Sequence, residues 1–310
     1  MSSPQTVDPN SPAAKGAALH EVPCYLCGEE EKQLLHEKPP FKIVQCPKCH
    51  LVYTTPQCSV EELREMYQTD YWQSESAKDF GYTDYLADEA DYLKTFRMRS
   101  QVVTDIFKEP GKVLEVGSAA GYFLEVMKDQ GWDVTGVEIS EHVTKQARTR
   151  YGLDNIHVGT LEETMPKLEK GAYDAVCFWD VIEHLVDPAA DIKRAHELLK
   201  PEGILVIETQ NVASRFAKML GEKWHHFKYL EHLYHFSPET VAKMLDQCGF
   251  RVVRNTGRFG GKHVSFGFIR ERTARIHPVL PKVLFPLKWV AKRSLYLNLF
   301  DEMIVVSKKK

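Results

Sequence analysis

The 310-residue sequence predicts an α/β protein with a doubly wound, mainly parallel sheet and a small cysteine-rich unit at its N-terminus. Short apolar runs alternate with segments of helical periodicity between residues 112 and 209. This alternation is typical of parallel strands covered by helices on both faces. A glycine-containing turn follows the first apolar run, and two C-x-x-C pairs precede it. We therefore expect one large domain with a small module attached.

Composition divides the rest of the chain. Residues 1–18 are rich in Ser, Pro, Ala and Gln, and we expect a disordered tail because they offer little apolar material to pack. Residues 19–58 hold the C-x-x-C pairs, residues 59–107 are mostly helical and aromatic by pattern, and residues 108–310 form the predicted core. No apolar stretch of 18 residues occurs and the N-terminus lacks an apolar signal region, so neither a membrane span nor a leader is expected.

The two C-x-x-C pairs are Cys24 with Cys27 and Cys46 with Cys49, eighteen residues apart. Each pair makes a tight turn that presents two thiolates, and two such turns can close a tetrahedral Zn²⁺ site. The spacing predicts a zinc ribbon whose zinc is structural, since four thiolates leave no open coordination position. A redox-active dithiol is the alternative, but it does not require a second copy. Cysteine usage of this kind indicates a reducing, cytoplasmic location.

The aromatic segment, residues 59–107, begins with a capping box formed by Ser59 and Glu62. Its aromatic side chains can either cover a ligand as a lid or pack into the core. Tyr71, Tyr82 and Tyr85 are the candidates for contact with a substrate, because polar residues flank them.

The stretch from Lys112 to Ser140 has the pattern strand, turn, helix, strand. Gly117 and Gly121 bracket the turn, where backbone can approach a ligand closely. The second strand ends on Glu138, about twenty residues after the turn, where a carboxylate can bind ribose hydroxyls. The stretch therefore predicts a nucleoside-type cofactor, with a ligand-free βαβ turn as the alternative.

The run Glu115-Val116-Gly117-Ser118-Ala119-Ala120-Gly121 resembles the E-x-G-x-G-x-G motif of class I S-adenosylmethionine (SAM)-dependent methyltransferases, with Ala119 at the middle glycine. The runs YDAVCFWDVIEHLVDP and ELLKPEGILVIETQN are also similar to this family, especially to its ubiquinone-type and sugar-modifying members. The resemblance implies a seven-stranded, Rossmann-like SAM-methyltransferase sheet whose last strand is antiparallel. The SAM-binding residues that it implies are Glu115, Gly117, Ser118, Gly121, Glu138, Thr160 and Asp180.

Residues 223–238, the histidine segment, hold four of the thirteen histidines. The set Tyr229-x-Glu231-His232 resembles a loop of zinc-ribbon deoxysugar C-methyltransferases. The resemblance implies that His232 is the general base, that Glu231 orients it and that Tyr229 stands at the sugar. His184, which follows the fourth predicted strand, is the second candidate for the base.

Two other histidine patterns allow a different interpretation. His232 and His235 have the spacing of metal ligands on a helix, but Ser237 and Pro238 begin the predicted helix only after them. The Gly260–His263 turn looks like a related loop of the same enzymes, with His263 in a shifted position.

The C-terminal part is basic, with 14 Lys and Arg against 3 Asp and Glu from residue 251 to residue 310. Its insertion, residues 271–300, is predicted to be helical after Pro286 and amphipathic. Residues 286–300 can lie on the inner membrane surface as a peripheral contact, or pack on the core with a solvated basic face. The charge favours a phosphate-bearing substrate. The overall charge of −3 gives no nucleic-acid signature.

These observations predict SAM-dependent methyl transfer to a sugar or glycan precursor, either nucleotide-linked or lipid-linked. O-methylation of a quinone or small aromatic is the alternative. A non-catalytic SAM-fold scaffold or binding protein is an alternative of another class, and Glu138 and the histidine segment argue against it.

Overall fold

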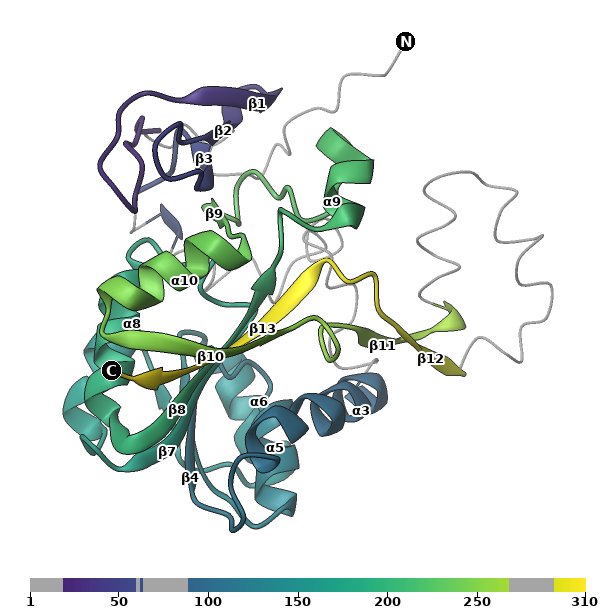
Figure 1. Cartoon of the computed structure of the whole chain (residues 1–310). Helices are drawn as coiled ribbons and strands as arrows, with labels where there is room; N and C mark the ends of the chain where they lie inside the picture. The colour runs from purple at the N-terminus through teal and green to yellow at the C-terminus, as the bar shows by residue number, and fades with distance from the viewer. Residues whose placement is uncertain (1–18, 60–61, 64–88, 268–292) are drawn as a thin grey trace.

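The structure is a computed structural model, and it describes residues 19–59, 62–63, 89–267 and 293–310. Its largest element is a seven-stranded sheet of order β10-β13-β8-β7-β4-β5-β6 (Figure 1). Strand β13 runs antiparallel to both of its neighbours, and the other strands run parallel to one another. The strands are β4 (Lys112–Val116), β5 (Asp133–Glu138), β6 (Ile156–Val158), β7 (Tyr173–Trp179), β8 (Leu199–Gln210), β10 (Phe250–Thr256) and β13 (Glu302–Lys309). The predicted doubly wound sheet is confirmed.

Helices cover both faces of this sheet (Figure 1). Strand side chains alternate between two buried clusters: Leu114 packs with α8 and α10, whereas Val113 packs with α3 and α5. The predicted helix start at Ser237 is present, since Ser237 accepts from the backbone of Thr240, and Asp187 likewise caps α8 by accepting from that of Ala190. The helices are α3 (Glu89–Arg99), α4 (Gln101–Thr104), α5 (Tyr122–Asp129), α6 (Glu141–Tyr151), α7 (Leu161–Thr164), α8 (Pro188–Leu198), α9 (Arg215–Leu220) and α10 (Pro238–Gln247).

A second sheet contains the cysteine unit, residues 19–58. It has the order β1-β2-β3-β9, with β1 (Gln33–Lys38), β2 (Phe41–Gln45), β3 (Val52–Thr55) and β9 (Tyr234–His235). Strand β9 belongs to the histidine segment and pairs with β3 (Figure 1). Tyr53 of β3 and Phe178 of β7 share one buried cluster. The cysteine unit is therefore packed onto the large domain and paired with its histidine segment.

One element differs from its prediction. The helix expected over residues 286–300 is wrong at its described end, because Ser294–Leu297 forms strand β12 and pairs antiparallel with β11 (Lys262–Ser265). Pairing with β11 satisfies these backbone groups between strands, which outweighs the helical spacing of Leu295 and Leu299. The remainder of the predicted amphipathic helix, the tail 1–18, and Tyr71, Tyr82 and Tyr85 lie outside the described residues.

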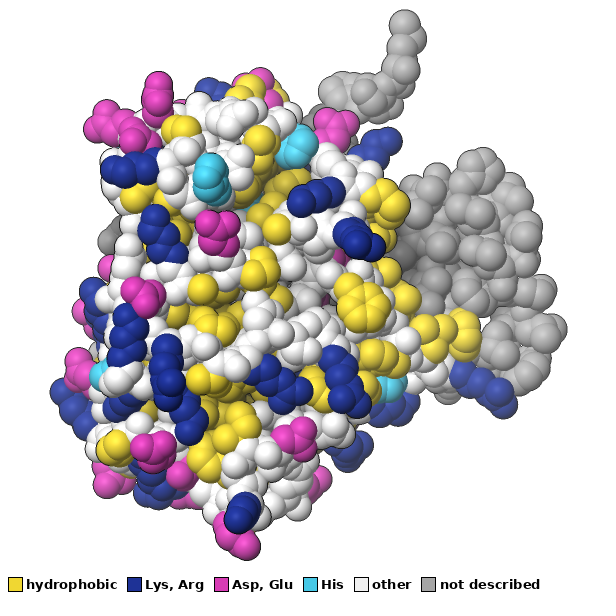
Figure 2. Space-filling model, viewed as in Figure 1, with side chains coloured by type: hydrophobic (Ala, Val, Ile, Leu, Met, Phe, Trp, Pro, Cys, Tyr) yellow, Lys and Arg dark blue, Asp and Glu magenta, His cyan; other side chains and the backbone are white. Residues whose placement is uncertain are grey.

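The described aromatic residues before the core pack inward. Tyr92 of α3 stacks on Tyr122 of α5 with ring centroids 5.3 Å apart, and Phe96 lies in the buried cluster with Phe123. These two residues therefore pack into the core, which was the alternative to a lid over the ligand. Among the described helices, none is long and apolar enough to cross a membrane. Lys and Arg side chains gather along the outer edge formed by β10 (Figure 2).

Candidate active site

Glu138 fixes the glycine-containing turn between β4 and α5. Its buried carboxylate accepts hydrogen bonds from the backbone N–H groups of Ala119 and Ser140, both at 2.8 Å. Gly117 and Ala119 both have left-handed backbone, with φ of 73° and 45°. A Cβ on Gly117 would lie 2.6 Å from Cγ2 of Val181, so only glycine fits there. The turn and Glu138 therefore form one unit, as the sequence predicts.

Gly121 has a packing role in addition to the one its motif implies. It adopts φ 79° as the N-cap of α5, and a Cβ there would lie 2.6 Å from Leu153 Cδ1 and 3.1 Å from Ala147 Cβ. Its missing side chain lets α5 approach α6 closely. Gly121 shapes the turn through packing, and a direct contact with a cofactor stays a prediction.

Three buried polar groups around this turn lack a hydrogen-bond partner among the described residues: Glu115 Oε2, Ser118 Oγ and Ser140 Oγ. Burial, and then the neighbouring Glu138, raise the pKa of Glu115 well above its usual value. Buried polar groups are normally satisfied by protein, water or ligand. This set therefore fits a site for a polar ligand such as SAM at the end of β4.

Thr160 lies at the carboxyl end of β6, but its hydroxyl oxygen already caps α7 by accepting from the backbone N–H of Glu163. Glu162 points to Arg194, at 3.0 Å. The predicted contact of Thr160 with adenine stays a prediction.

A buried network of charges follows the ends of β7 and β8. Arg99 of α3 pairs with Glu208 and, at 3.3 Å, with Glu302, while Lys262 of β11 lies 3.1 Å from both Asp180 and Glu302. Burial alone would raise the pKa of Asp180, but Lys262 and then Arg99 hold it well below its usual value. Asp180 is therefore an anion at the carboxyl edge of the sheet, where the sequence places it.

The sequence reading missed the rest of this network. In the Gly260–His263 turn, Lys262 reaches Asp180, whereas His263 packs against Tyr296 with ring centroids 5.3 Å apart. Alternation along a strand puts Lys262 and His263 on opposite sides. Glu208 could have been found from its place near the carboxyl end of a predicted strand. Arg99 gave no local signal.

His184 and His232 form the second half of the site. Their rings meet edge to face with centroids 4.7 Å apart, and His184 Nδ1 donates to the backbone oxygen of Glu231 at 2.9 Å. His232 is buried, and its Nδ1 has no partner in the described chain. Donor atoms of Glu183, His184 and His232 all lie within 4.8 Å of one another. The two candidate bases are thus neighbours.

The structure does not pair His232 with its predicted partner, Glu231. The Glu231 carboxylate pairs with Lys228 Nζ at 3.0 Å, and no bond joins it to the His232 ring. In this structure the Glu231 carboxylate is therefore engaged with Lys228 and not with its neighbour. Tyr229 lies beside β1, where the Nζ atom of Lys38 is 5.8 Å from the centroid of the Tyr229 ring. Tyr229 has no described contact with His232. Glu183 is the carboxylate that lies beside both histidines.

Burial sets the protonation states of this group. It lowers the pKa of His184 to about 4, with a further contribution from Lys228, and holds the pKa of His232 well below its usual value. Burial, and then the negative charge of Asp180, raise the pKa of Glu183 to about 8. At neutral pH both histidines are uncharged and can accept a proton.

The cysteine unit holds the histidine segment in place. Thr54 of β3 donates its backbone N–H to Leu233 O at 2.9 Å and its hydroxyl to His232 O at 2.8 Å. On the other side, Leu233 donates its N–H to Glu183 O at 2.8 Å. The backbone that carries His232 is therefore clamped between β3 and the loop after β7.

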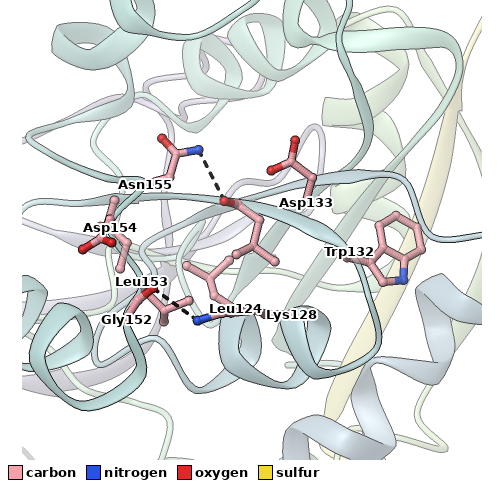
Figure 3. Close-up of a pocket in the computed structure, with 10 residues that line it drawn as sticks. Leu124, Lys128, Trp132, Asp133, Gly152, Leu153, Asp154 and Asn155 are labelled. Carbon is pink, nitrogen blue, oxygen red and sulfur yellow. Dashed lines mark hydrogen bonds between the residues drawn. The ribbon is translucent and has the colours of Figure 1, made fainter.

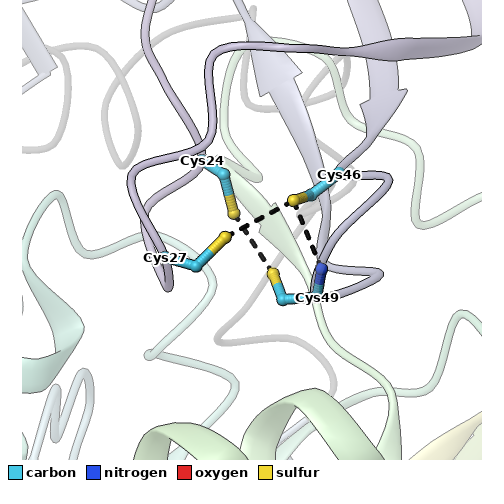
Figure 4. A group of neighbouring side chains, drawn as sticks. All are labelled: Cys24, Cys27, Cys46 and Cys49. Atoms are coloured by element: carbon cyan, nitrogen blue, oxygen red, sulfur yellow. Dashed lines mark hydrogen bonds between the residues drawn. The ribbon is translucent and has the colours of Figure 1, made fainter.

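The four cysteines converge, as the sequence predicts (Figure 4). The Sγ atoms of Cys24 and Cys49 are 3.3 Å apart, those of Cys27 and Cys46 are 3.5 Å apart, and all four thiols are free. The edge of a zinc–thiolate tetrahedron is about 3.8 Å, given bonds of about 2.3 Å. Cys49 N–H also donates to Cys46 Sγ at 3.4 Å. The donor set and its spacing fit Zn²⁺.

A separate pocket lies at the opposite end of the sheet, near the amino ends of β5 and β6 (Figure 3). Lys128, Asp133 and Asn155 line it, and the Lys128 ammonium donates to the backbone oxygens of Tyr151 and Gly152. Ligands of doubly wound sheets bind at the carboxyl ends of the strands. The pocket is therefore distinct from the candidate active site.

The fold and the turn held by Glu138 define a nucleotide-binding α/β enzyme. A family model described as "Methyltransferase domain" matches residues 86–255, more than half of the chain. The chain belongs to this family, and it contains a class I SAM-dependent methyltransferase domain. The predictions of fold, enzyme class and SAM are confirmed, and the family favours an enzyme over the scaffold alternative.

Relatives align with the core. The ubiquinone biosynthesis O-methyltransferase of Xanthomonas campestris pv. campestris (strain B100) is 31% identical over 134 residues, which cover 38% of this chain and 56% of the relative. That of Pasteurella multocida (strain Pm70) is 29% identical over 174 residues, covering 48% and 72%. The chain thus spans little more than half the length of the first of these relatives.

Solved structures share the fold. The 1,6-didemethyltoxoflavin-N1-methyltransferase of Burkholderia thailandensis, with bound 1,6-didemethyltoxoflavin and S-adenosylhomocysteine, has a TM-score of 0.52 at 17% identity and covers 90% of this chain and 99% of its own. A putative methyltransferase of Haloferax volcanii, in complex with the Trm112 methyltransferase activator, has a TM-score of 0.52 at 15% identity, covering 80% and 97%. At these identities the similarity concerns the fold alone.

Proposed function

We propose that this chain transfers the methyl group of SAM to a hydroxyl oxygen of a quinone-type or other small aromatic molecule, with His232 as the general base. The observation that carries the proposal is the buried, uncharged His232, with an unpartnered Nδ1, beside Glu183 and His184. The names of the ubiquinone-biosynthesis relatives support the acceptor class.

The SAM-binding half is assigned to Glu138, Gly117 and Ser118, with Glu115 and Asp180 nearby. When bound, SAM supplies an electrophilic methyl group. Glu138 would hold the ribose hydroxyls, and the turn backbone the methionine end. Ser118 Oγ and Glu115 Oε2 would gain the partners that they now lack.

The acceptor half positions the nucleophile and removes its proton. His232 Nδ1 would take the hydroxyl proton as the oxygen forms its bond to the methyl carbon and the bond from that carbon to the SAM sulfur breaks, which leaves S-adenosylhomocysteine. A base in this role is worth roughly 10²–10⁴ in rate. His184 is fixed by Glu231 O and supports the His232 ring edge-on. Glu183, once ionised, would stabilise the protonated imidazole.

We also propose that Cys24, Cys27, Cys46 and Cys49 hold a structural Zn²⁺. Four free thiols within 4.8 Å of one another support this assignment. The zinc would hold the turns of the cysteine unit in place beneath β3, which in turn binds the backbone of His232. Zinc analysis after dialysis against a mild chelator should find one more tightly bound zinc per chain in the wild type than in Cys46→Ser.

Methylation of a sugar or glycan precursor is the second candidate. The Tyr229-x-Glu231-His232 set, and the pairing of its segment with the cysteine unit, favour it. The basic C-terminal part suits a nucleotide-linked or lipid-linked saccharide. Contact of residues 286–300 with a membrane, which their charge would favour, belongs to the same proposal.

Methyl transfer from isotope-labelled SAM to two panels separates these candidates. One panel contains catechols and polyprenylated benzoquinols, and the other contains nucleotide sugars. We expect labelled O-methyl ether products from the first panel only. Label in the second panel alone would replace the aromatic acceptor by the sugar, and failure to bind SAM would contradict the proposal as a whole.

A further inference from the structure

We propose that His225, His226 and Asp301 form a second metal site, for a divalent transition-metal ion, at the acceptor side of the carboxyl edge. His225 and His226 belong to the histidine segment, and Asp301 immediately precedes β13. Asn211, which follows β8, donates its N–H to Asp301 O at 2.7 Å. The three side chains thus meet where β8 ends and β13 begins.

The donor atoms of the three side chains lie within 4.8 Å of one another. His225 Nε2 and His226 Nε2 lie 3.8 Å and 3.7 Å from the same oxygen, Asp301 Oδ2. These distances are too long for hydrogen bonds. Two ligand atoms that bind one ion with bonds of about 2.0–2.2 Å are about 3.0–3.5 Å apart. A small movement of the histidine rings toward Asp301 would bring the observed separations to these values.

In the part of the chain that the structure describes, two members of the group, His226 and Asp301, lack the partners that an ion would supply. His226 is 12% exposed, and its Nε2 has no hydrogen-bond partner among the described residues. The Asp301 side chain is 5% exposed, and no described Lys or Arg lies within 4.0 Å of it. The nearby Lys262 forms its ion pairs with Asp180 and Glu302. A buried carboxylate without a cation is costly, so a bound metal ion would stabilise it.

Trp224 gives the carboxylate a fixed direction. Its buried Nε1–H donates to Asp301 Oδ2 at 2.9 Å, and its ring packs edge-on against that of His226 at 5.1 Å. Hydrogen bonds of this kind orient ligands in established metal sites. Trp224 therefore acts as a positioning residue.

The donor set determines the class of ion. Two imidazoles and one carboxylate suit Zn²⁺, Mn²⁺, Fe²⁺ or Co²⁺ rather than Ca²⁺, which prefers oxygen ligands alone. Three protein ligands leave coordination positions open. His226 and His232 have ring centroids 6.1 Å apart, so an acceptor oxygen on the ion would lie near the proposed base. This last step rests on the proposed function, whereas metal binding does not.

Titration with Mn²⁺, followed by the loss of its free electron paramagnetic resonance signal, tests the site without any acceptor. The thiolates of the cysteine unit select Zn²⁺ over Mn²⁺, so they interfere little. We expect one Mn²⁺ per chain, with at least tenfold weaker binding in Asp301→Asn and in His226→Ala. His142→Ala is the matched control, because His142 is an exposed histidine of α6.

Asp301→Asn keeps an oxygen for Trp224 and should fold, which circular dichroism and SAM binding verify. Trp224→Phe should bind Mn²⁺ more weakly with the ligands intact. Absence of saturable Mn²⁺ binding in the wild type, or unchanged binding in Asp301→Asn, would overturn the site. Mn²⁺ binding with no methyl transfer to either acceptor panel would retain the site and reject the proposed function.

Discussion

The two halves of the candidate site are built differently. The cofactor half consists of a turn between β4 and α5 and the end of β5, which are close in sequence and joined by Glu138. The acceptor half brings together β3, the loop after β7, the histidine segment and the start of β13, which are separated by up to some 250 residues of the printed sequence. Local sequence order determines the first half, and long-range pairing determines the second.

Removal of the base should have the largest effect and should fall on the acceptor half alone. His232→Ala is expected to lower kcat roughly 10²–10⁴-fold, because proton removal from the hydroxyl is lost. SAM affinity should stay within a few-fold, since His232 has no described contact with the Glu138 turn. Steady-state kinetics and calorimetric SAM binding measure the two effects. Unchanged turnover would remove His232 from the mechanism.

Substitution of Glu138 should affect the cofactor half alone. Glu138→Gln is expected to weaken SAM binding about tenfold to a hundredfold, because hydrogen bonds to a charged group contribute about 1.5–3 kcal/mol. At saturating SAM, kcat should remain near that of the wild type. If kcat fell as much as it does in His232→Ala, the two halves would not be separable.

The pKa of Glu183, raised to about 8, predicts a pH dependence within the acceptor half. Above pH 8 its carboxylate is charged and increases the proton affinity of the neighbouring imidazoles. We expect kcat to rise about tenfold from pH 7 to pH 9, as the ionised fraction does. Glu183→Gln should flatten this rise, and an identical profile in the variant would assign it to another group.

The stability that Glu183 contributes to the fold should decrease as pH rises, whereas kcat should increase. The folded protein keeps the Glu183 proton between the unfolded pKa of 4.5 and the folded value of about 8, so it binds more protons than the unfolded chain in this window. The contribution of Glu183 to stability is therefore full below pH 4.5 and is lost as pH rises through 8. Thermal melting of the wild type and Glu183→Gln at pH 6 and pH 9 measures this difference.

The clamp between the cysteine unit and the histidine segment should have a smaller effect. Thr54→Val keeps the side-chain shape but removes the hydroxyl that donates to His232 O. A loss of about 1 kcal/mol in positioning corresponds to roughly a fivefold lower kcat. SAM affinity and zinc content should be unchanged. A parallel loss of zinc would indicate that the variant disturbs the cysteine unit rather than the clamp.

The sequence predicted what periodicity and spacing encode. The strands of the large sheet, the helix start at Ser237, the position of Glu138 and the convergence of the four cysteines all follow from local patterns. It could not predict that Glu183 rather than Glu231 lies beside His232. That depends on how a turn orients two adjacent side chains.

Contacts between residues far apart in the sequence were also not predicted. Arg99 pairs with Glu208 more than a hundred residues away, and no local pattern marks it. The strand Ser294–Leu297 forms because β11 is available to pair with it, although its own spacing favours a helix. Both contacts join segments that are distant in the sequence, so local patterns do not predict them.

The smallest effect should come from Ala119, the irregular position of the cofactor motif. Its φ of 45° is left-handed, which costs a residue with a Cβ about 1–2 kcal/mol. Ala119→Gly removes this strain but increases the entropy of the unfolded chain by about 0.4–1 kcal/mol. We expect a change in stability of at most about 1 kcal/mol and SAM affinity within about threefold, because the N–H that Glu138 accepts is retained. Denaturant unfolding and SAM binding measure both effects. A tenfold gain in affinity would mean that the Ala119 methyl group obstructs the cofactor, and that the turn is less well adapted to SAM than its bond to Glu138 indicates.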